Sequence, residues 1–189
     1  MSRLVLLLEE YSMKVLLDEL LPRLFPALSF LCVPHEGKQD LEKSIPRKLK
    51  AWHEPGTCFI VVRDNDGGNC GALKTRLLGL CEGDKRERTR VRIACQELEA
   101  WYFGDLQALA DVYGERAFRG LSRKARFRDP DAINQPSRAL AQLAPEFQKV
   151  SGARAMGARL AADRNRSPSF QAFLGAVRIL FPPPSPETA

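Results

Sequence analysis

Phe59-Ile60-Val61-Val62-Arg63-Asp64-Asn65-Asp66-Gly67-Gly68 is a β-branched apolar run that stops at two acids and a pair of glycines. The apolar run is typical of a buried strand, and the glycines indicate a turn directly after it. Ligands of open parallel α/β sheets collect beyond the carboxyl ends of the strands. Asp64 and Asp66 are therefore expected where a ligand binds, and their oxygens suit a divalent cation.

Three further apolar runs have the length of a strand, at residues 3–8, 28–33 and 91–95. Segments with helical periodicity separate the four runs, and they are predicted at 12–24, 39–52 with an interruption at Pro46, and 72–81. Ser12 is predicted to cap the first of these helices. Strict alternation of strand and helix favours a mainly parallel four-stranded sheet flanked by helices on both faces.

The remainder of the chain shows only helical patterns. Helices are predicted at 96–103, 106–113, 136–143, 153–162 and 169–180, with Asp105 as the cap of the second. We therefore expect an α/β domain at 1–103, a C-terminal helical extension at 104–181 packed on it, and a disordered Pro-rich tail at 182–189. The bulky run Trp101, Tyr102 and Phe103 is interpreted as core.

The composition is that of an ordinary globular protein. The chain has 189 residues, of which 44% are hydrophobic, and a formal charge of +6 favours an anionic partner such as nucleic acid. Its five cysteines include no C-x-x-C pair, so the sequence indicates neither a disulfide framework nor a zinc site, and a reducing cytoplasm is expected. The apolar run at 4–8 is too short to span a membrane.

A second pair of acids, Glu9 and Glu10, follows the first strand. If the first and third strands are neighbours, these acids and the Asp64–Asp66 pair emerge at the same edge of the sheet. Clustered carboxylates raise one another's pKa unless a cation neutralises them. A purely oxygen ligand set favours Mg²⁺ or Mn²⁺ over zinc.

The sequence also resembles a known family. The motifs that carry the resemblance are Leu8-Glu9-Glu10-Tyr11-Ser12, Val61-Val62-Arg63-Asp64-Asn65-Asp66, Cys95-Gln96-Glu97-Leu98-Glu99-Ala100-Trp101-Tyr102-Phe103-Gly104-Asp105 and Pro168-Ser169-Phe170-Gln171-Ala172-Phe173. A strand ending in Glu and a later strand ending in Asp-x-Asp are typical of the Toprim fold of topoisomerases, primases and overcoming-lysogenization-defect (OLD) nucleases. Over nearly its full length, the chain is similar to the bacterial domain of unknown function 4276 family.

The resemblance implies a Mg²⁺-dependent phosphoryl-transfer site, most plausibly a nuclease acting on DNA or RNA. It also implies a role in phage defence and a partner ATPase. Glu9, Asp64 and Asp66 match the catalytic and metal-binding acids of the pattern. Because Glu10 stands where the pattern has a small residue, either acid could face the metal, and we favour Glu9. Glu99 is a further candidate ligand, which would complete the cluster, support it from behind, or act only as an acid at a helix N-terminus.

Nucleic acid requires a basic surface. The basic residues expected to contact phosphates are Arg63, Arg123, Lys124, Arg126 and Arg128, with the alternative that Arg63 orients one of the neighbouring acids. An alternative reading of the whole sequence is a non-catalytic binding or regulatory module that docks on a partner ATPase. The phosphate-binding glycine motifs of P-loop and dinucleotide-binding proteins are absent from the sequence.

Overall fold

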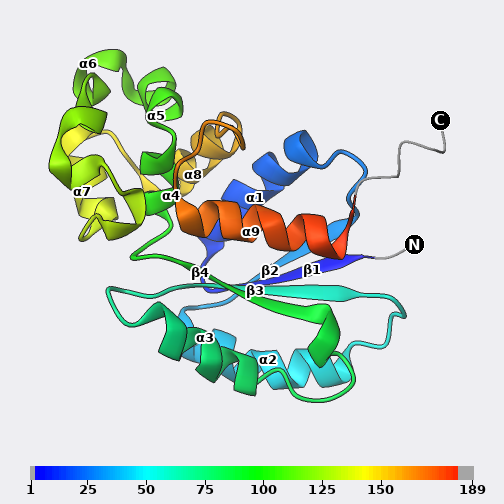
Figure 1. The fold of residues 1–189 in the computed structure, drawn as a ribbon. Coiled ribbons are helices and arrows are strands. Elements are labelled where there is room, and N and C mark those ends of the chain that lie inside the picture. The colour runs from blue at the N-terminus through cyan, green and yellow to red at the C-terminus, as the bar shows by residue number, and fades with distance from the viewer. Residues whose placement is uncertain (1–2, 183–189) are drawn as a thin grey trace.

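A parallel four-stranded sheet forms the centre of the molecule (Figure 1). The computed structural model describes residues 3–182. The strands are β1 (Leu4–Leu8), β2 (Phe30–Pro34), β3 (Cys58–Asp64) and β4 (Thr89–Ala94), in the spatial order β2-β1-β3-β4. All three strand pairs are parallel, and Leu8 of β1 lies opposite Val62 of β3. The predicted four-stranded parallel sheet is confirmed, including the adjacency of the first and third strands.

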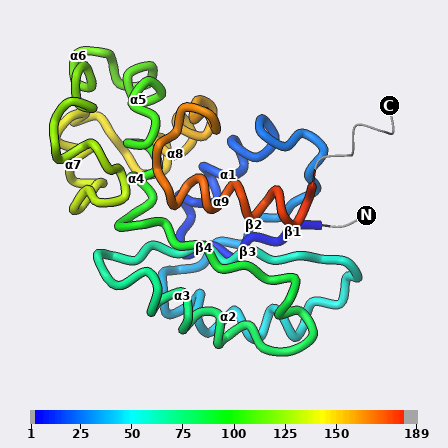
Figure 2. Tube along the Cα trace, in the orientation of Figure 1, coloured from blue at the N-terminus to red at the C-terminus, as the bar shows by residue number. Residues whose placement is uncertain are grey.

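Helices cover both faces of the sheet (Figures 1 and 2). One face carries α2 (Lys38–Ala51) and α3 (Cys70–Gly79), and the other carries α1 (Tyr11–Leu24) and the C-terminal α9 (Pro168–Leu180). Alternate strand residues supply the two apolar layers: Leu4, Leu6 and Leu8 face α1, whereas Val5 and Leu7 face α2. A short 3₁₀ turn, Arg86–Arg88, leads into β4.

The remaining helices are short and gather at one end of the sheet (Figure 1). They are α4 (Glu99–Gly104), α5 (Leu106–Tyr113), α6 (Glu115–Phe118), α7 (Pro136–Leu143) and α8 (Lys149–Gly157), with 3₁₀ turns at Leu121–Arg123, Ala125–Phe127 and Pro130–Ala132. Buried side chains of α4 and α9 join the same apolar layer as α1, for example Trp101 and Phe173, whose ring centroids are 5.2 Å apart. The boundary predicted near Gly104 remains a prediction, and this core extends across it.

Several local predictions need correction. The helix α2 is continuous through Pro46, because the exposed proline ring lies outside the core and only one helical N–H is missing. Ser12 is not the cap of α1: Glu10 occupies that position, and the Ser12 hydroxyl donates a hydrogen bond to the Glu10 carboxylate. Helix α4 starts at Glu99 rather than at residue 96, since Gln96 has a left-handed backbone with φ 66°.

Two other predictions concern the C-terminal half. Asp105 caps α5 as expected, with its Oδ1 accepting a hydrogen bond from the Ala108 N–H at 3.1 Å. The tail predicted to be disordered, 182–189, lies outside the described residues except for Pro182.

Candidate functional site

Glu9 and Asp64 meet at the carboxyl ends of β1 and β3. The parallel pairing continues past the strands, where the Glu9 N–H donates to the Val62 carbonyl at 3.2 Å. The Glu9 Oε2 atom in turn accepts a hydrogen bond from the Asp64 backbone N–H at 3.0 Å. The adjacency of β1 and β3 therefore brings together two acids that are 55 positions apart in the sequence.

The Asp64 side chain is buried in an environment that disfavours its charge. It is 7% exposed, and its Oδ1 atom has no hydrogen-bond partner among residues 3–182. Burial raises the pKa of Asp64 well above its usual range, and the nearby charges of Glu9, Glu10 and Glu99 raise it further. Burial also raises the pKa of Glu9. Without a metal, the negative charges of these carboxylates are therefore unfavourable, and a bound cation would stabilise them.

Glu99 lies close enough to Asp64 for its charge to raise the pKa of that residue. It is the first residue of α4, is 1% exposed, and its Oε2 atom has no hydrogen-bond partner in the part of the chain that the structure describes. Burial raises the pKa of Glu99 to about 7, although the Lys149 ammonium lowers it. The buried hydroxyl of Tyr102 also lacks a partner within residues 3–182, and burial and the charge of Glu99 raise its pKa well above the usual range. Glu99 is therefore a buried acid of this cluster and not simply an exposed acid at a helix N-terminus.

Lys149 is a member of the site that the sequence analysis missed. It begins α8, and its Nζ lies 3.2 Å from the Glu10 Oε2. Burial lowers the pKa of Lys149, but the charges of Glu10, Glu99 and Asp64 outweigh that effect and the pKa is raised overall. Nothing local in the sequence signals this role, since α8 reaches the acids only by packing on α1.

Glu10 and Asp66 are more open to solvent than Asp64. The Glu10 carboxylate is bound by Ser12 and Lys149, so the structure places Glu9, and not Glu10, against Asp64. Asp66 has a left-handed backbone with φ 49° and an exposed side chain, and its Oδ2 lies 3.5 Å from the Lys38 Nζ. The charge of Asp66 nevertheless contributes to the raised pKa of Glu9, which shows that it lies within electrostatic range.

Arg63 contacts the acids through its buried guanidinium group. Its side chain is 7% exposed, its guanidinium forms an ion pair with Glu42, and its Nε lies 3.7 Å from the Glu9 Oε2. These contacts favour a role in holding Glu9 over the nucleic-acid contact expected from the sequence.

The donor set suits a hard cation. Carboxylate oxygens are available at Glu9, Asp64 and Glu99, two of them are buried without hydrogen-bond partners among the described residues, and Asp66 is near. Within residues 3–182, however, no group of three His, Cys, Asp or Glu side chains is already arranged to hold a metal ion. Ion binding at this rim would require a local rearrangement, and Asp66 is the exposed acid of the cluster.

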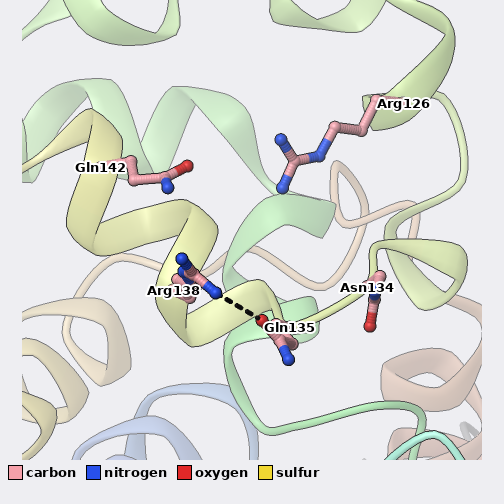
Figure 3. A pocket seen from close by; sticks show the side chains of 5 residues that line it. All are labelled: Arg126, Asn134, Gln135, Arg138 and Gln142. Atoms are coloured by element: carbon pink, nitrogen blue, oxygen red, sulfur yellow. Dashed lines mark hydrogen bonds between the residues drawn. The ribbon is translucent and has the colours of Figure 1, made fainter.

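A basic surface lies on the helical part of the molecule. Arg123, Lys124, Arg126 and Arg128 are all exposed, and they lie in or directly after the 3₁₀ turns Leu121–Arg123 and Ala125–Phe127. Next to them is a hollow of about 320 Å³ lined by Arg126, Asn134, Gln135, Arg138 and Gln142 (Figure 3). Two guanidinium groups and three amides offer hydrogen-bond donors to an anion. Arg138 was not among the residues predicted from the sequence.

Comparisons with known proteins show the family to which the chain belongs. The model of the domain of unknown function DUF4276 matches residues 8–178. The chain belongs to the DUF4276 family. No curated protein matches it.

Two solved structures share the fold. The C-terminal region of the Burkholderia pseudomallei OLD protein matches with a TM-score of 0.55 and 16% identity, covering 95% of this chain and 99% of that one. The corresponding region of the Xanthomonas campestris pv. campestris OLD protein, phased with iodine, gives a TM-score of 0.54 and 14% identity, covering 94% and 95%. At these identities the likeness concerns the fold, and it confirms the predicted Toprim-like architecture. No helix within residues 3–182 combines the length and apolar character needed to cross a membrane.

Proposed function

We propose that this DUF4276 protein is a nuclease that uses Mg²⁺ or Mn²⁺ to hydrolyse phosphodiester bonds of DNA or RNA. The observation that carries the proposal is the buried Asp64 carboxylate, which lies against Glu9 with a raised pKa and with one oxygen lacking a hydrogen-bond partner among residues 3–182. Acids buried together in this way are costly unless a cation joins them. Perturbed carboxylates in such a place indicate function more often than stability.

The acids divide into three roles. Asp64 and Glu9 would hold the ion at the rim of the sheet, and Asp66 would join them once its loop moves away from Lys38. A divalent cation bound there would polarise a phosphate and stabilise the charge of an in-line displacement. Glu99, whose pKa is raised to about 7, is poised to accept or release a proton near neutral pH or to bind a second ion. Glu10 would orient Lys149.

Lys149 adds a cationic group to the same site. Its ammonium group is held by Glu10 at 3.2 Å and lies within the field of Asp64 and Glu99. A lysine beside a cluster of acids is suited to contact a phosphate oxygen of a bound strand. Such a contact would compensate the negative charge of the substrate where it meets the acids.

The basic surface would bind the part of the nucleic-acid strand that extends beyond the acids. Arg123, Lys124 and Arg128 would contact phosphates, and the hollow between Arg126 and Arg138 would hold one of them more closely. The likeness to the C-terminal regions of two OLD proteins supports the same proposal at the level of the fold. A partner ATPase, a cytoplasmic location and a role in phage defence belong to the proposal as well.

Cleavage assays test it directly. Labelled single- and double-stranded DNA and RNA are incubated with the protein in Mg²⁺, in Mn²⁺ and in EDTA. We expect cleavage that needs a metal and falls by at least about 100-fold in Asp64→Asn, because one metal oxygen becomes an amide. Asp84→Asn is the matched control, since Asp84 is an exposed acid before β4, at the other end of the sheet. Equal cleavage by wild type and Asp64→Asn would contradict the proposal.

A second candidate function rests on the ion pairs of the site. Arg63, Lys149 and Lys38 already provide cations for Glu9, Glu10 and Asp66. These pairs would suit a non-catalytic module that docks on a partner ATPase and keeps its acids for a regulatory ion or as relics. This alternative predicts no cleavage of any substrate in either metal, together with co-purification of the partner.

A further inference from the structure

Two cysteines face each other beside the acidic rim. Cys70 is the first residue of α3 and Cys95 directly follows β4, and their sulfur atoms are 3.2 Å apart. Both residues are partly exposed, whereas Cys32 and Cys81 are buried. The number and spacing of the cysteines indicate no disulfide framework, and spacing along the chain gives no sign of this contact.

The sulfur pair is connected to the loop that carries Asp66. Asn65 lies between the two acids, and its Nδ2 donates hydrogen bonds to the Cys70 Sγ at 3.0 Å and to the Gly68 carbonyl at 2.6 Å. Its Oδ1 accepts a hydrogen bond from the backbone N–H of Gln96, the residue after Cys95. The Asp66 N–H donates to the Gln96 carbonyl at 3.0 Å. The start of the 65–70 loop is therefore hydrogen-bonded to the segment that carries Cys95, and the end of the loop is Cys70 itself.

We infer that Cys70 and Cys95 are a reversible oxidation site, at which a hydroperoxide forms a disulfide that fixes the 65–70 loop with Asp66 held away from Asp64. The sulfur atoms need to approach by only about 1 Å to reach bonding distance. The thiol pair stands on its own geometry. Its effect on the metal site rests on the proposed function.

The chemistry divides between the two thiols. The Cys70 thiol loses its proton to solvent, and the thiolate attacks the terminal oxygen of the hydroperoxide; an S–O bond forms, the O–O bond breaks, the displaced alkoxide (hydroxide for hydrogen peroxide) takes a proton from solvent and leaves as alcohol or water, and Cys70 becomes a sulfenic acid. The Cys95 sulfur then attacks the Cys70 sulfur, so that the S–S bond forms, the S–O bond breaks, and the Cys95 proton leaves with hydroxide as water. Burial raises the pKa of Cys95 to about 12, which favours Cys70 as the first thiol to react. A small dithiol returns both residues to thiols.

The disulfide would act on the metal site through the loop. In the structure Asp66 forms an ion pair with Lys38, and the described residues contain no group of three acids already arranged to bind a metal. Metal binding therefore requires the loop to move. A bond from Cys70, at the end of the loop, to Cys95 opposes that movement, because it ties this end of the loop to β4 while the start of the loop continues from β3, which pairs with β4. Oxidation is therefore expected to weaken metal binding.

The test treats the reduced, folded full-length chain with hydrogen peroxide. Peptide mapping by mass spectrometry is expected to find a Cys70–Cys95 link that dithiothreitol removes. Cys70→Ser and Cys95→Ser should lack the link, whereas Cys58→Ser, which changes the other partly exposed cysteine, should keep it. In the oxidised protein, amide hydrogen exchange over residues 65–70 should slow by about ten-fold, and Mn²⁺ binding by calorimetry should weaken by a similar factor.

The outcomes are separable. Oxidation that scatters over the cysteines without the Cys70–Cys95 link overturns the inference. A link that leaves hydrogen exchange of the loop unchanged overturns the claim that it fixes the loop. A link that slows exchange in a protein that binds no Mn²⁺ even when reduced confirms the thiol pair and contradicts the proposed metal site.

Discussion

The Glu9 Oε2 accepts a hydrogen bond from the backbone N–H of Asp64 at 3.0 Å, and this bond fixes the geometry of the acidic rim. The donor is a backbone group at the point where β3 ends, so the position of the Glu9 carboxylate depends on the register of β1 and β3. Arg63, whose Nε is 3.7 Å from the same oxygen, supports Glu9 from the other side. The metal hypothesis therefore starts from two acids that the sheet itself aligns.

The stability of the metal-free protein is expected to fall as the pH rises from about 4.5 to above 7. Glu99 has its pKa raised from 4.5 to about 7 by burial, so it stabilises the fold fully below pH 4.5 and loses that contribution as the pH passes 7. A shift of this size corresponds to roughly 3 kcal/mol. Urea unfolding in EDTA at pH 5 and pH 8 measures the effect.

Glu99→Gln is expected to remove the part of that pH dependence that Glu99 contributes, since the amide does not titrate, while the raised pKa values of Asp64 and Glu9 leave the remainder. Glu82→Gln changes an exposed acid and serves as the control. An unchanged slope of unfolding free energy against pH in Glu99→Gln would show that Glu99 does not titrate as described.

Close packing of α8 on α1 sets the position of Lys149. A Cβ atom at Gly157 would lie 2.6 Å from the Leu16 carbonyl oxygen, so Gly157→Ala should push the helices apart and destabilise the protein by about 1–3 kcal/mol. Gly175 in α9 has open space around its Cβ position, and Gly175→Ala should instead stabilise by about 0.5–1 kcal/mol. Thermal unfolding of the two variants compares them, and equal effects of the two would contradict the close contact.

The hollow between Arg126 and Arg138 is expected to bind a phosphate of the nucleic acid. Arg126→Ala and Arg138→Ala should each weaken binding of a labelled oligonucleotide in EDTA, where no cleavage occurs. Each should also reduce the slope of log affinity against log salt by about 1. Arg116→Ala, an exposed arginine on α6, is the control. If Arg126→Ala and Arg138→Ala both keep the wild-type slope of log affinity against log salt, the hollow does not contact the nucleic acid.

Much of the fold could be predicted from short apolar runs. The strand ending at Leu8 is apolar over its whole length and the strand ending at Asp64 is apolar up to Val62, as strands buried on both faces are, and the intervening helices fix a parallel arrangement. The meeting of Glu9 with Asp64 followed from that topology. Local signals were weaker at Pro46 and Ser12, where the tertiary packing of α2 and the Glu10 carboxylate decided the outcome.

The rest of the site depends on packing that no local pattern records. Lys149 and Cys95 reach the rim because α8 packs on α1 and β4 pairs with β3. The sequence left Arg63 either to orient an acid or to contact a phosphate, and the choice depends on Glu42, 21 positions away on α2, which forms an ion pair with its guanidinium. Such contacts between distant elements could be found only from the three-dimensional structure.

Thermal unfolding with and without Mn²⁺ tests the central claim most directly, because it needs no substrate. Mn²⁺ at about 100 times its dissociation constant adds roughly 2.7 kcal/mol, which corresponds to a rise in melting temperature of about 5–10 °C for a chain of this size. We expect this rise in wild type and in Asp84→Asn and its absence in Asp64→Asn. No rise in wild type, or an equal rise in Asp64→Asn, would contradict it.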